Sequence, residues 1–554
     1  MLRAVDERKK FGAFYTPDSL SQLLCDWAIR SRSETVLEPS FGGCGLLRSS
    51  KFRLSKLGAK KPINQIFGWD IDPIAFQYLA DMLESPVDLK NFIHGSFLSA
   101  ETPPDWPERF DTVVANPPYI PYQSLDSATR KELQARVWPV PNIGGRASLW
   151  AYFILESLSK LKVSGRMAWI LPGTVMNANY AKPILEYLPS VFSRSLALIV
   201  RDRIFLDEGT DEETVILLLD DYSPGGTSGT IHVCRSEKLA DIPNEIVKWD
   251  LNQQRVFTPD FRQAHLSMNE TVLKQFHKLS ELPSAKTLGD IATVQIGLVT
   301  GANEFFILNN SSLAANGLGS TDCKPILSKF NQAPGLRFRR KDFLSMAALD
   351  ARVYLIDATN ANKSVPLQDY LNSFDKERIA KISTFKKRKI WSQPDDNKIP
   401  DAFFPVMHHT GPRIVLNDDQ MTCTNTTHRL YFKDKVPSHQ RRLVAISLLT
   451  SFSQLSAEMT GRTYGSGVLK HEPREAEKIK LLLPDIAKST VNTWFKRIDL
   501  KLRSGIESEA SALADELIFG ALKMKDVQRT SRKLQATLQL VRDARRPSKR
   551  SQQH

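Results

Sequence analysis

Cysteine is scarce in this chain of 554 residues: only five are present, and they lie far apart. No two of them form a C-x-x-C pair, so neither a thiolate zinc site nor a disulfide framework is indicated. The adjacent His408 and His409 have no acid or cysteine at ligand spacing, and we interpret them as an ordinary surface or core pair. The sequence therefore predicts no metal site.

Long apolar runs are also missing. No stretch approaches the length that a membrane-spanning helix needs. The first ten residues, MLRAVDERKK, are charged and contain no apolar core of a signal peptide. We therefore expect a cytoplasmic protein with no membrane partner.

The overall composition is that of an ordinary globular protein, with 42% hydrophobic and 25% charged residues. A chain of 554 residues is too long for one core, so two or three domains are expected. The net charge of +14 favours a polyanionic partner, of which nucleic acid is the commonest. A basic protein without such a partner would carry the same charge, so the motifs must decide.

Short apolar runs alternate with helical segments through the first 222 residues. We predict strands near 35–38, 65–70, 91–98, 110–116, 166–172, 195–200 and 213–222, and helices over 20–30, 74–84 and 148–165, the last closed by Gly165. This alternation predicts an α/β fold with a doubly wound, mostly parallel, Rossmann-like sheet. Its ligand is expected at the carboxyl ends of the strands.

The pattern changes at the turn-rich segment 223–229. We therefore place a first domain at 1–228 and a second, mixed α/β domain with short strands at 229–500. Residues 501–554 are expected to form a C-terminal helix and a basic, disordered tail that begins near residue 542.

A glycine turn follows the first predicted strand. Gly42 and Gly43 allow the backbone to approach a ligand closely, but the segment is neither G-x-G-x-x-G nor a phosphate loop. Asp70 ends the second strand, where a carboxylate can accept both hydroxyls of a ribose. Each feature alone is compatible with a plain strand–helix turn. Together they favour an adenosine that carries no phosphate, such as that of S-adenosylmethionine.

The fourth predicted strand ends in Asn116-Pro117-Pro118-Tyr119. Proline cannot donate a ladder hydrogen bond, so strand pairing must stop there. The side-chain oxygen of Asn116 and the carbonyl of Pro117 can accept the two hydrogens of an exocyclic amine, and Tyr119 offers a face for stacking a base. A strand-ending turn with a packed tyrosine is the plainer interpretation of these four residues in isolation.

These motifs, in this order, resemble the gamma-class adenine-N6 DNA methyltransferases of type II restriction–modification systems. The matching segments are GAFYTP (12–17), VLEPSFGGCGLL (36–47), GWDIDP (68–73), HGSFL (94–98) and ANPPYI (115–120). The resemblance implies a methyltransferase domain followed by a target-recognition domain. It also implies a prokaryotic cytoplasmic enzyme that uses S-adenosylmethionine.

The resemblance implies roles for individual residues. The implied cofactor-binding residues are Tyr15, Thr16, Pro17, Glu38, Pro39, Ser40, Gly42, Gly43, Asp70, Ser96 and Phe97. The implied catalytic residues are Asn116, Pro117, Pro118, Tyr119 and, as a second ring against the base, Phe205. Ser96 departs from the family, which usually has an aspartate there, and a hydroxyl is a weaker acceptor than a carboxylate.

The second half carries the expected DNA contacts. Segments 296–308 and 462–473 resemble signatures of the family's target-recognition domain, and the latter contains Tyr464 and Lys470. Two segments that mix cations with aromatic residues are suited to phosphate contacts, although a solvated basic face would look the same. Their cations are Arg337, Arg339, Arg340, Lys386, Lys387 and Arg388. Segment 120–147 is expected to order over DNA when the site closes.

The partners implied by the resemblance are double-stranded DNA and a separately encoded restriction endonuclease, with a monomer as the default state. Three alternatives remain open from the residues: an RNA adenine-N6 methyltransferase, a protein glutamine-N5 methyltransferase with the same NPPY chemistry, and a DNA-binding module whose catalytic fold is inactive. A fused nuclease is disfavoured, because no P-D-x(n)-E-x-K arrangement is evident.

Overall fold

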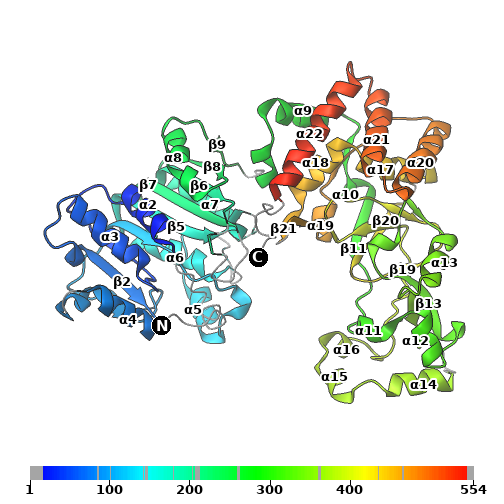
Figure 1. The fold of residues 1–554 in the computed structure, drawn as a ribbon, viewed down its shortest axis with the longest axis horizontal. Helices are drawn as coiled ribbons and strands as arrows, with labels where there is room; N and C mark the ends of the chain where they lie inside the picture. Colours follow the sequence, from blue (N-terminus) through cyan, green and yellow to red (C-terminus); the bar gives the residue numbers. More distant parts are fainter. Residues whose placement is uncertain are drawn as a thin grey trace. The chain divides into compact units, whose positions relative to one another are not determined.

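The computed structural model describes residues 16–83, 86–99, 101–140, 143, 147–176, 178, 180–202, 204–205, 213–258, 262–359, 364–434, 436–464 and 467–545. The chain divides into two compact units, Met1–Leu266 and Ser267–His554 (Figure 1). The predicted boundary at 228/229 lies inside the first unit, because the strands that follow it join the N-terminal sheet.

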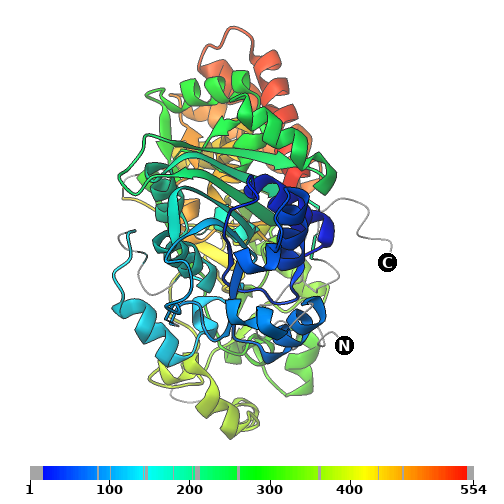
Figure 2. The same cartoon turned by 90° about the vertical axis from the view of Figure 1, so that its left-hand side faces the viewer.

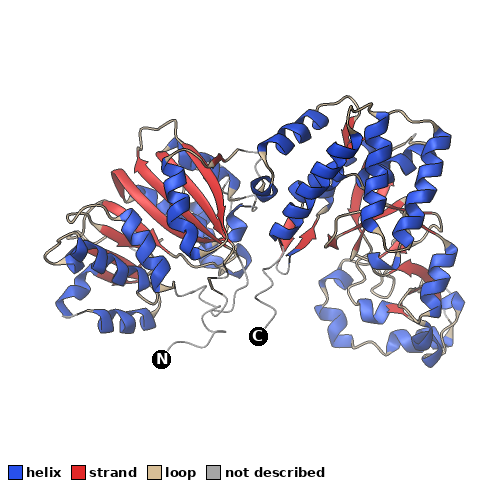
Figure 3. Cartoon of the chain, turned by 45° about the horizontal axis from the view of Figure 1, so that its top comes forward, coloured by secondary structure: helices blue, strands red, loops and turns tan. Residues whose placement is uncertain are grey.

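The N-terminal unit is built on a nine-stranded sheet with the order β3-β2-β1-β4-β5-β7-β6-β8-β9. Its strands are β1 (Val36–Glu38), β2 (Ile66–Asp70), β3 (Phe92–His94), β4 (Phe110–Ala115), β5 (Leu161–Pro172), β6 (Phe192–Val200), β7 (Thr214–Tyr222), β8 (Thr230–Ser236) and β9 (Arg255–Val256). Strands β1 to β5 pair in parallel, whereas β7 runs antiparallel between β5 and β6. The predicted doubly wound, mostly parallel sheet is confirmed (Figure 3).

Alternating side chains bury both faces of this sheet. In β5, Met167 and Trp169 belong to one hydrophobic cluster and Ala168 to the other, as the two-residue period of a strand requires. The covering helices are α2 (Asp18–Ala28), α3 (Gly45–Lys56), α4 (Pro73–Met82), α5 (Ser127–Ala135), α6 (Leu149–Ser159), α7 (Lys182–Tyr187) and α8 (Ile242–Asp250). Helices α2 and α3 contact each other (Figures 1 and 2).

The predicted helix over 148–165 is too long. Helix α6 ends at Ser159, and β5 begins at Leu161. Residues 162–165 form an irregularity in the pairing with β4, where Ser164 has a φ of +60°. Gly165 thus lies within β5 and does not close a helix. The irregularity lets β5 stay paired with β4 on both sides of it.

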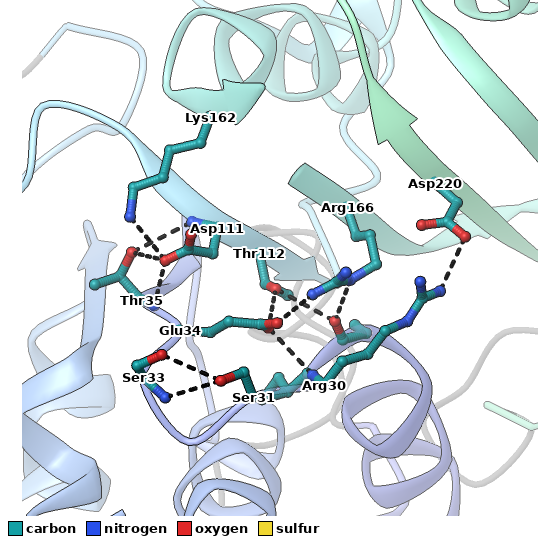
Figure 4. A network of polar contacts seen from close by, with 12 residues as sticks. Arg30, Ser31, Ser33, Glu34, Thr35, Asp111, Thr112, Lys162, Arg166 and Asp220 are labelled. Atoms are coloured by element: carbon teal, nitrogen blue, oxygen red, sulfur yellow. Dashed lines mark hydrogen bonds and ion pairs between the residues drawn. The ribbon is translucent and has the colours of Figure 1, made fainter. Parts of the chain in front are cut away.

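A polar network holds the C-terminal end of α2 against the sheet (Figure 4). Arg166 donates to the carbonyl of Ala28 at 2.7 Å and forms an ion pair with Glu34. Thr112 also donates to Glu34, at 3.0 Å, and Arg30 pairs with Asp220 at 2.9 Å. These contacts fix the helix whose other end carries Thr16 and Pro17.

In the part of the C-terminal unit that the structure describes, there are four small sheets: β11-β20-β16-β18-β14, β12-β15-β13-β19, β17-β22-β21 and β10-β23. Its strands are β10 (Ala285–Thr287), β11 (Ala292–Ile296), β12 (Ile307–Leu308), β13 (Cys323–Leu327), β14 (Arg337–Phe338), β15 (Tyr354–Ile356), β16 (Ala402–Pro405), β17 (Met407–His408), β18 (Val415–Asn417), β19 (Thr422–Cys423), β20 (Thr427–Phe432), β21 (Arg462–Tyr464), β22 (Val468–Lys470) and β23 (Lys480–Leu482). These short strands agree with the predicted mixed α/β domain.

Helices surround these sheets. They are α9 (Glu270–Ser280), α10 (Leu288–Ile291), α11 (Asn303–Phe306), α12 (Asn310–Ala315), α13 (Arg340–Ala348), α14 (Val365–Asn372), α15 (Lys376–Lys381), α16 (Ser383–Lys386), α17 (Ser438–Leu448), α18 (Ser451–Thr460), α19 (Pro473–Ala476), α20 (Lys488–Arg503), α21 (Glu507–Ala521) and α22 (Val527–Arg545). The last three pack with α17 and α18, so they are part of this unit and not a separate appendage. The predicted tail starts too early, since residues 542–545 belong to α22.

Within the described ranges, no helix combines the length and the apolar character needed to cross a bilayer.

Candidate active site

A cavity of about 360 Å³ lies at the carboxyl ends of β1, β2 and β4. Its lining includes most of the residues singled out from the sequence: Thr16, Glu38, Pro39, Ser40, Gly42, Gly43, Asp70, Ser96, Phe97, Asn116 and Pro118. Pro17 and Pro117 adjoin lining residues in the chain, while Tyr15 lies outside the described residues. Residues as far apart in the chain as Thr16 and Asn116, 100 positions, thus meet at the edge of the sheet where a doubly wound fold binds its ligand.

The glycine turn and the second strand meet through Asp70. The backbone N–H of Gly42 donates to Oδ2 of Asp70 at 2.7 Å, and that of Asp72 donates to Oδ1 at 2.8 Å. Gly42 has a φ of +42°, a conformation that glycine tolerates best. Burial raises the pKa of Asp70, and the two backbone donors offset part of that rise. Because each carboxylate oxygen has a second lone pair, Asp70 can still accept from a ligand.

Glu38, the last residue of β1, is a buried carboxylate in the cavity wall. Glu38 is only 2% exposed, and its Oε2 accepts no hydrogen bond from the described residues. Burial, followed by repulsion from Asp70, raises the pKa of Glu38 well above its usual value. A cation or a donor placed in the cavity would satisfy this carboxylate.

One part of the cavity wall is apolar, and the sequence did not point to most of it. Its apolar side chains include Ile71, Phe97, Leu149 and Phe153. Leu149 and Phe153 stand four positions apart on α6, so they share one face of the helix. The rings of Phe97 and Phe153 have centroids 5.4 Å apart. The four-residue spacing of Leu149 and Phe153 was the signal in the sequence that could have pointed to this wall. An ordinary core helix shows the same spacing.

The N-P-P-Y segment is held by both upstream motifs. Asn116 is half-buried and donates from Nδ2 to Oγ1 of Thr16 at 3.1 Å. Ser40 donates to the backbone carbonyl of Asn116 at 3.3 Å. Pro117 is buried, and Tyr119 is half-buried. Asn116 is therefore held at its side-chain amide by Thr16, before the first strand, and at its backbone carbonyl by Ser40, after that strand.

Phe205 is placed differently from the expectation. It is 1% exposed and packs in the hydrophobic cluster that includes Leu20, Val114 and Ile170. The structure does not bring it into the lining of the described cavity. Its neighbours 206–212 lie outside the described residues.

The segment after N-P-P-Y is already ordered in part. Leu125 and Leu133 are buried in the core, and together with Asp126 and Thr129 they line the cavity. Trp138 packs against Tyr152 with ring centroids 5.3 Å apart. Part of this segment therefore belongs to the cavity wall, and the expected ordering over DNA remains a prediction.

In the C-terminal unit, three of the predicted DNA-binding arginines contact aspartates. Arg337 pairs with Asp418. Arg339 lies 3.4 Å from Asp342, and Arg340 lies 3.7 Å from Asp419. These acids neutralise part of the positive charge that the sequence pattern indicated.

The three cations at 386–388 in the second basic segment differ in their surroundings. Lys386 and Lys387 are exposed. Arg388 instead donates to the carbonyls of Val299, Thr300 and Trp391 at 2.5, 2.8 and 3.1 Å. Arg388 therefore stabilises this unit, whereas the two lysines face solvent.

Tyr464 and Lys470 lie on paired strands. Strands β21 and β22 form an antiparallel hairpin, and β17 pairs with the outer side of β22. Lys470 forms an ion pair with Glu472 at 2.7 Å. We call β21 and β22 the recognition hairpin.

Two family sequence models match the chain. The one described as N-6 DNA Methylase matches residues 2–222. The one described as the C-terminal domain of the type II methyltransferase M.Eco57I matches residues 261–519. Together the two matches extend over most of the chain and identify an N6-adenine DNA methyltransferase of the restriction–modification kind, close to the type II modification enzymes.

Relatives of this kind extend over most of the chain. It is 23% identical to the type II methyltransferase M.AccI of Acinetobacter calcoaceticus over 86% of each chain. It is 21% identical to M.XamI of Xanthomonas campestris pv. amaranthicola over 85% of each. A solved structure, the type IIL restriction–modification enzyme MmeI in complex with DNA, has a similar fold with a TM-score of 0.51 and 11% identity, covering 95% of this chain and 74% of that one.

Proposed function

We propose that this protein transfers the methyl group of S-adenosylmethionine to N6 of an adenine rotated out of double-stranded DNA at a specific sequence. The observation that carries the proposal is the cavity itself. It places the carboxylates of Glu38 and Asp70 in the same wall as Asn116 of the N-P-P-Y segment. Groups suited to a cofactor and a group suited to an amine thus line one cavity.

The residues of the cavity fit this cofactor. Asp70 has lone pairs left for the two ribose hydroxyls. The buried carboxylate of Glu38, whose Oε2 has no protein donor among the described residues, suits the positively charged part of the molecule. The apolar wall formed by Phe97, Leu149 and Phe153 suits a flat adenine ring. When bound, the cofactor supplies a methyl group activated on a sulfonium.

The chemistry requires a better nucleophile than an aromatic amine, whose lone pair is delocalised into the ring. The side-chain oxygen of Asn116 and the carbonyl of Pro117 would each accept one amino hydrogen and make the nitrogen more tetrahedral. Tyr119 would stack on the extruded base. Transfer of the methyl group would leave the cofactor as a neutral thioether, and the proton given up by the amino nitrogen would pass to water beside the Asn116 and Pro117 oxygens.

Features of the whole chain favour DNA as the substrate. Extruding a base costs about a few kcal/mol, which contacts to the duplex must offset. The net charge of +14 and the exposed Lys386 and Lys387 suit phosphate contacts. Tyr464 and Lys470 of the recognition hairpin, with Arg337, Arg339 and Arg340, are the further candidates. We expect a cytoplasmic monomer that works beside a separately encoded endonuclease.

The test is transfer of labelled methyl from S-adenosylmethionine to DNA, RNA and protein by the native chain and by Asn116→Ala. Label should appear on DNA only, as N6-methyladenine, and Asn116→Ala should lose at least about a thousandfold in kcat. Asn316→Ala, at an exposed asparagine in the other unit, is the matched control. Label on RNA or protein, or full activity of Asn116→Ala, would reject the proposal. Calorimetry should show that Asn116→Ala still binds the cofactor.

A further inference from the structure

The C-terminal helix α22 lies beyond the region that the M.Eco57I C-terminal family model matches, which stops at residue 519. Its last turn nevertheless makes buried contacts with α18. Arg542 donates to Glu458 at 3.3 Å and to Gln454 at 2.7 Å. Arg545 donates to both carboxylate oxygens of Glu458, at 2.9 and 3.1 Å. The side chains of Arg545 and Glu458 are 6% and 2% exposed, so this ion pair is shielded from water.

Arg545 also reaches the recognition hairpin and a neighbouring loop. It donates to the carbonyl of Gly467, the residue directly before β22. It donates to the carbonyl of His409, directly after β17, at 2.6 Å. One guanidinium thus joins α18, the hairpin and the end of the strand that pairs with it. Because the guanidinium has five donors in a fixed plane, it can hold several acceptors in a set geometry.

The loop after β17 is fixed by the same helices. Gln454 donates to the carbonyl of Pro412 at 2.8 Å. Gly411 has a φ of +109°, and a Cβ at that position would lie 1.8 Å from the side-chain oxygen of Gln454. Next to it, His408 and His471 contact each other at 3.1 Å between ring nitrogens. The base of the hairpin is therefore closely packed, and the carbonyl of Gly467 is held from outside the sheet by Arg545.

We propose that Arg545 is a positioning residue that sets the recognition hairpin for contact with the target DNA sequence, with Glu458 fixing the guanidinium. The inference rests on the proposed function, because it assumes that the hairpin contacts DNA. Strand β21 is an edge of the small sheet β17-β22-β21, so the contacts of Arg545 beside β22 and β17 help to define how the hairpin is held. Arg545 would thus influence the binding of double-stranded DNA through the hairpin.

The test compares Arg545→Met with Arg532→Met, which removes an exposed arginine of the same helix. Amide hydrogen exchange should become faster in residues 467–470 and 407–411 of Arg545→Met only. The KM for cognate DNA should rise about tenfold, with kcat and cofactor affinity unchanged, because several charge-assisted hydrogen bonds are lost. Arg545→Lys keeps the charge near Glu458 but cannot bind both carbonyls, and should fall between Arg545→Met and the native chain.

The outcomes separate the two proposals. Unchanged exchange in the hairpin would overturn the positioning contact, whatever the activity. Faster exchange with an unchanged KM for DNA would overturn its role in recognition. A loss of cofactor affinity and thermal stability in both Arg545 variants would indicate a merely structural role and would also overturn it. If the native chain itself fails to methylate DNA, the proposed function falls, while the exchange measurement still decides the contact.

Discussion

Asn116 and Thr16, 100 positions apart in the chain, are joined by a hydrogen bond of 3.1 Å from the side-chain amide to the threonine hydroxyl. Thr16 stands just before α2, and the other end of α2 is attached to the sheet by Arg166, which donates to the carbonyl of Ala28, while Arg30 just after the helix pairs with Asp220. A residue that precedes the glycine turn thus orients the side-chain amide of Asn116.

Thr16→Val should therefore impair catalysis while leaving binding intact. Without the hydroxyl, Nδ2 of Asn116 loses the hydrogen bond to Thr16, and the amide is held less firmly in its orientation. We expect kcat to fall about tenfold to a hundredfold, with little change in the KM values for DNA and cofactor. Steady-state kinetics measures this, and Thr16→Ser, which keeps the hydroxyl, is the control. Equal activity of the valine and serine variants would contradict it.

Glu38→Gln should stabilise the protein without ligand and weaken cofactor binding. The pKa of Glu38 is raised in the folded protein, so its contribution to stability is present below its unfolded pKa and is lost as the pH rises through the folded pKa. The neutral amide avoids that loss, and the Tm of Glu38→Gln should exceed that of the native chain at pH 8 more than at pH 4. Cofactor affinity should fall by at least about tenfold, because a charged acceptor is lost.

Thermal unfolding and titration calorimetry at several pH values test this pair of effects. Cofactor binding to the native chain should strengthen as the pH rises, since a cationic ligand favours the carboxylate form of Glu38. That pH dependence should be weaker in Glu38→Gln. A stabilised variant that binds the cofactor normally would show that Glu38 does not contact it.

Ser96→Asp should increase cofactor affinity. Ser96 lines the cavity, and its hydroxyl accepts from the backbone N–H of Leu98 at 3.3 Å. A carboxylate at this position is a stronger acceptor for an adenine amino group, worth about tenfold in affinity. Ser99→Asp, three residues further along the cavity wall, is the positional control. If both variants weaken binding equally, repulsion from Asp70 and Glu38 dominates and the prediction is wrong.

The two halves of the second basic segment should respond differently to substitution. Replacing both Lys386 and Lys387 by Gln should weaken binding to all DNA sequences and reduce the salt slope of log K by about one per lysine, because fewer counterions are released. Arg388→Gln should instead lower the Tm, since it removes donors from three backbone carbonyls. Salt-dependent binding and thermal unfolding distinguish the two. A reduced salt slope for Arg388→Gln at unchanged Tm would reverse the assignment.

The sequence by itself determined the class of fold and the order of its motifs. Buried parallel strands are near-continuous apolar runs, and a glycine turn, Asp70 and N-P-P-Y are local features at strand ends, so all of them can be read along the chain. Because parallel strands bring their carboxyl ends to one edge, the meeting of these motifs in one cavity could also be expected.

Only the tertiary structure decided which charged and aromatic residues are available. The sequence indicated contact with the base for Phe205 and contact with DNA for Arg388. In the structure Phe205 is in the core, and Arg388 is bound to carbonyls that lie about 90 positions earlier. Leu149 and Phe153 line the cavity because of how α6 packs, which their helical spacing alone does not show. Arg545 contacts Glu458, Gly467 and His409 across 78 to 136 positions of sequence. Such contacts depend on long-range packing and burial, which local sequence patterns do not encode.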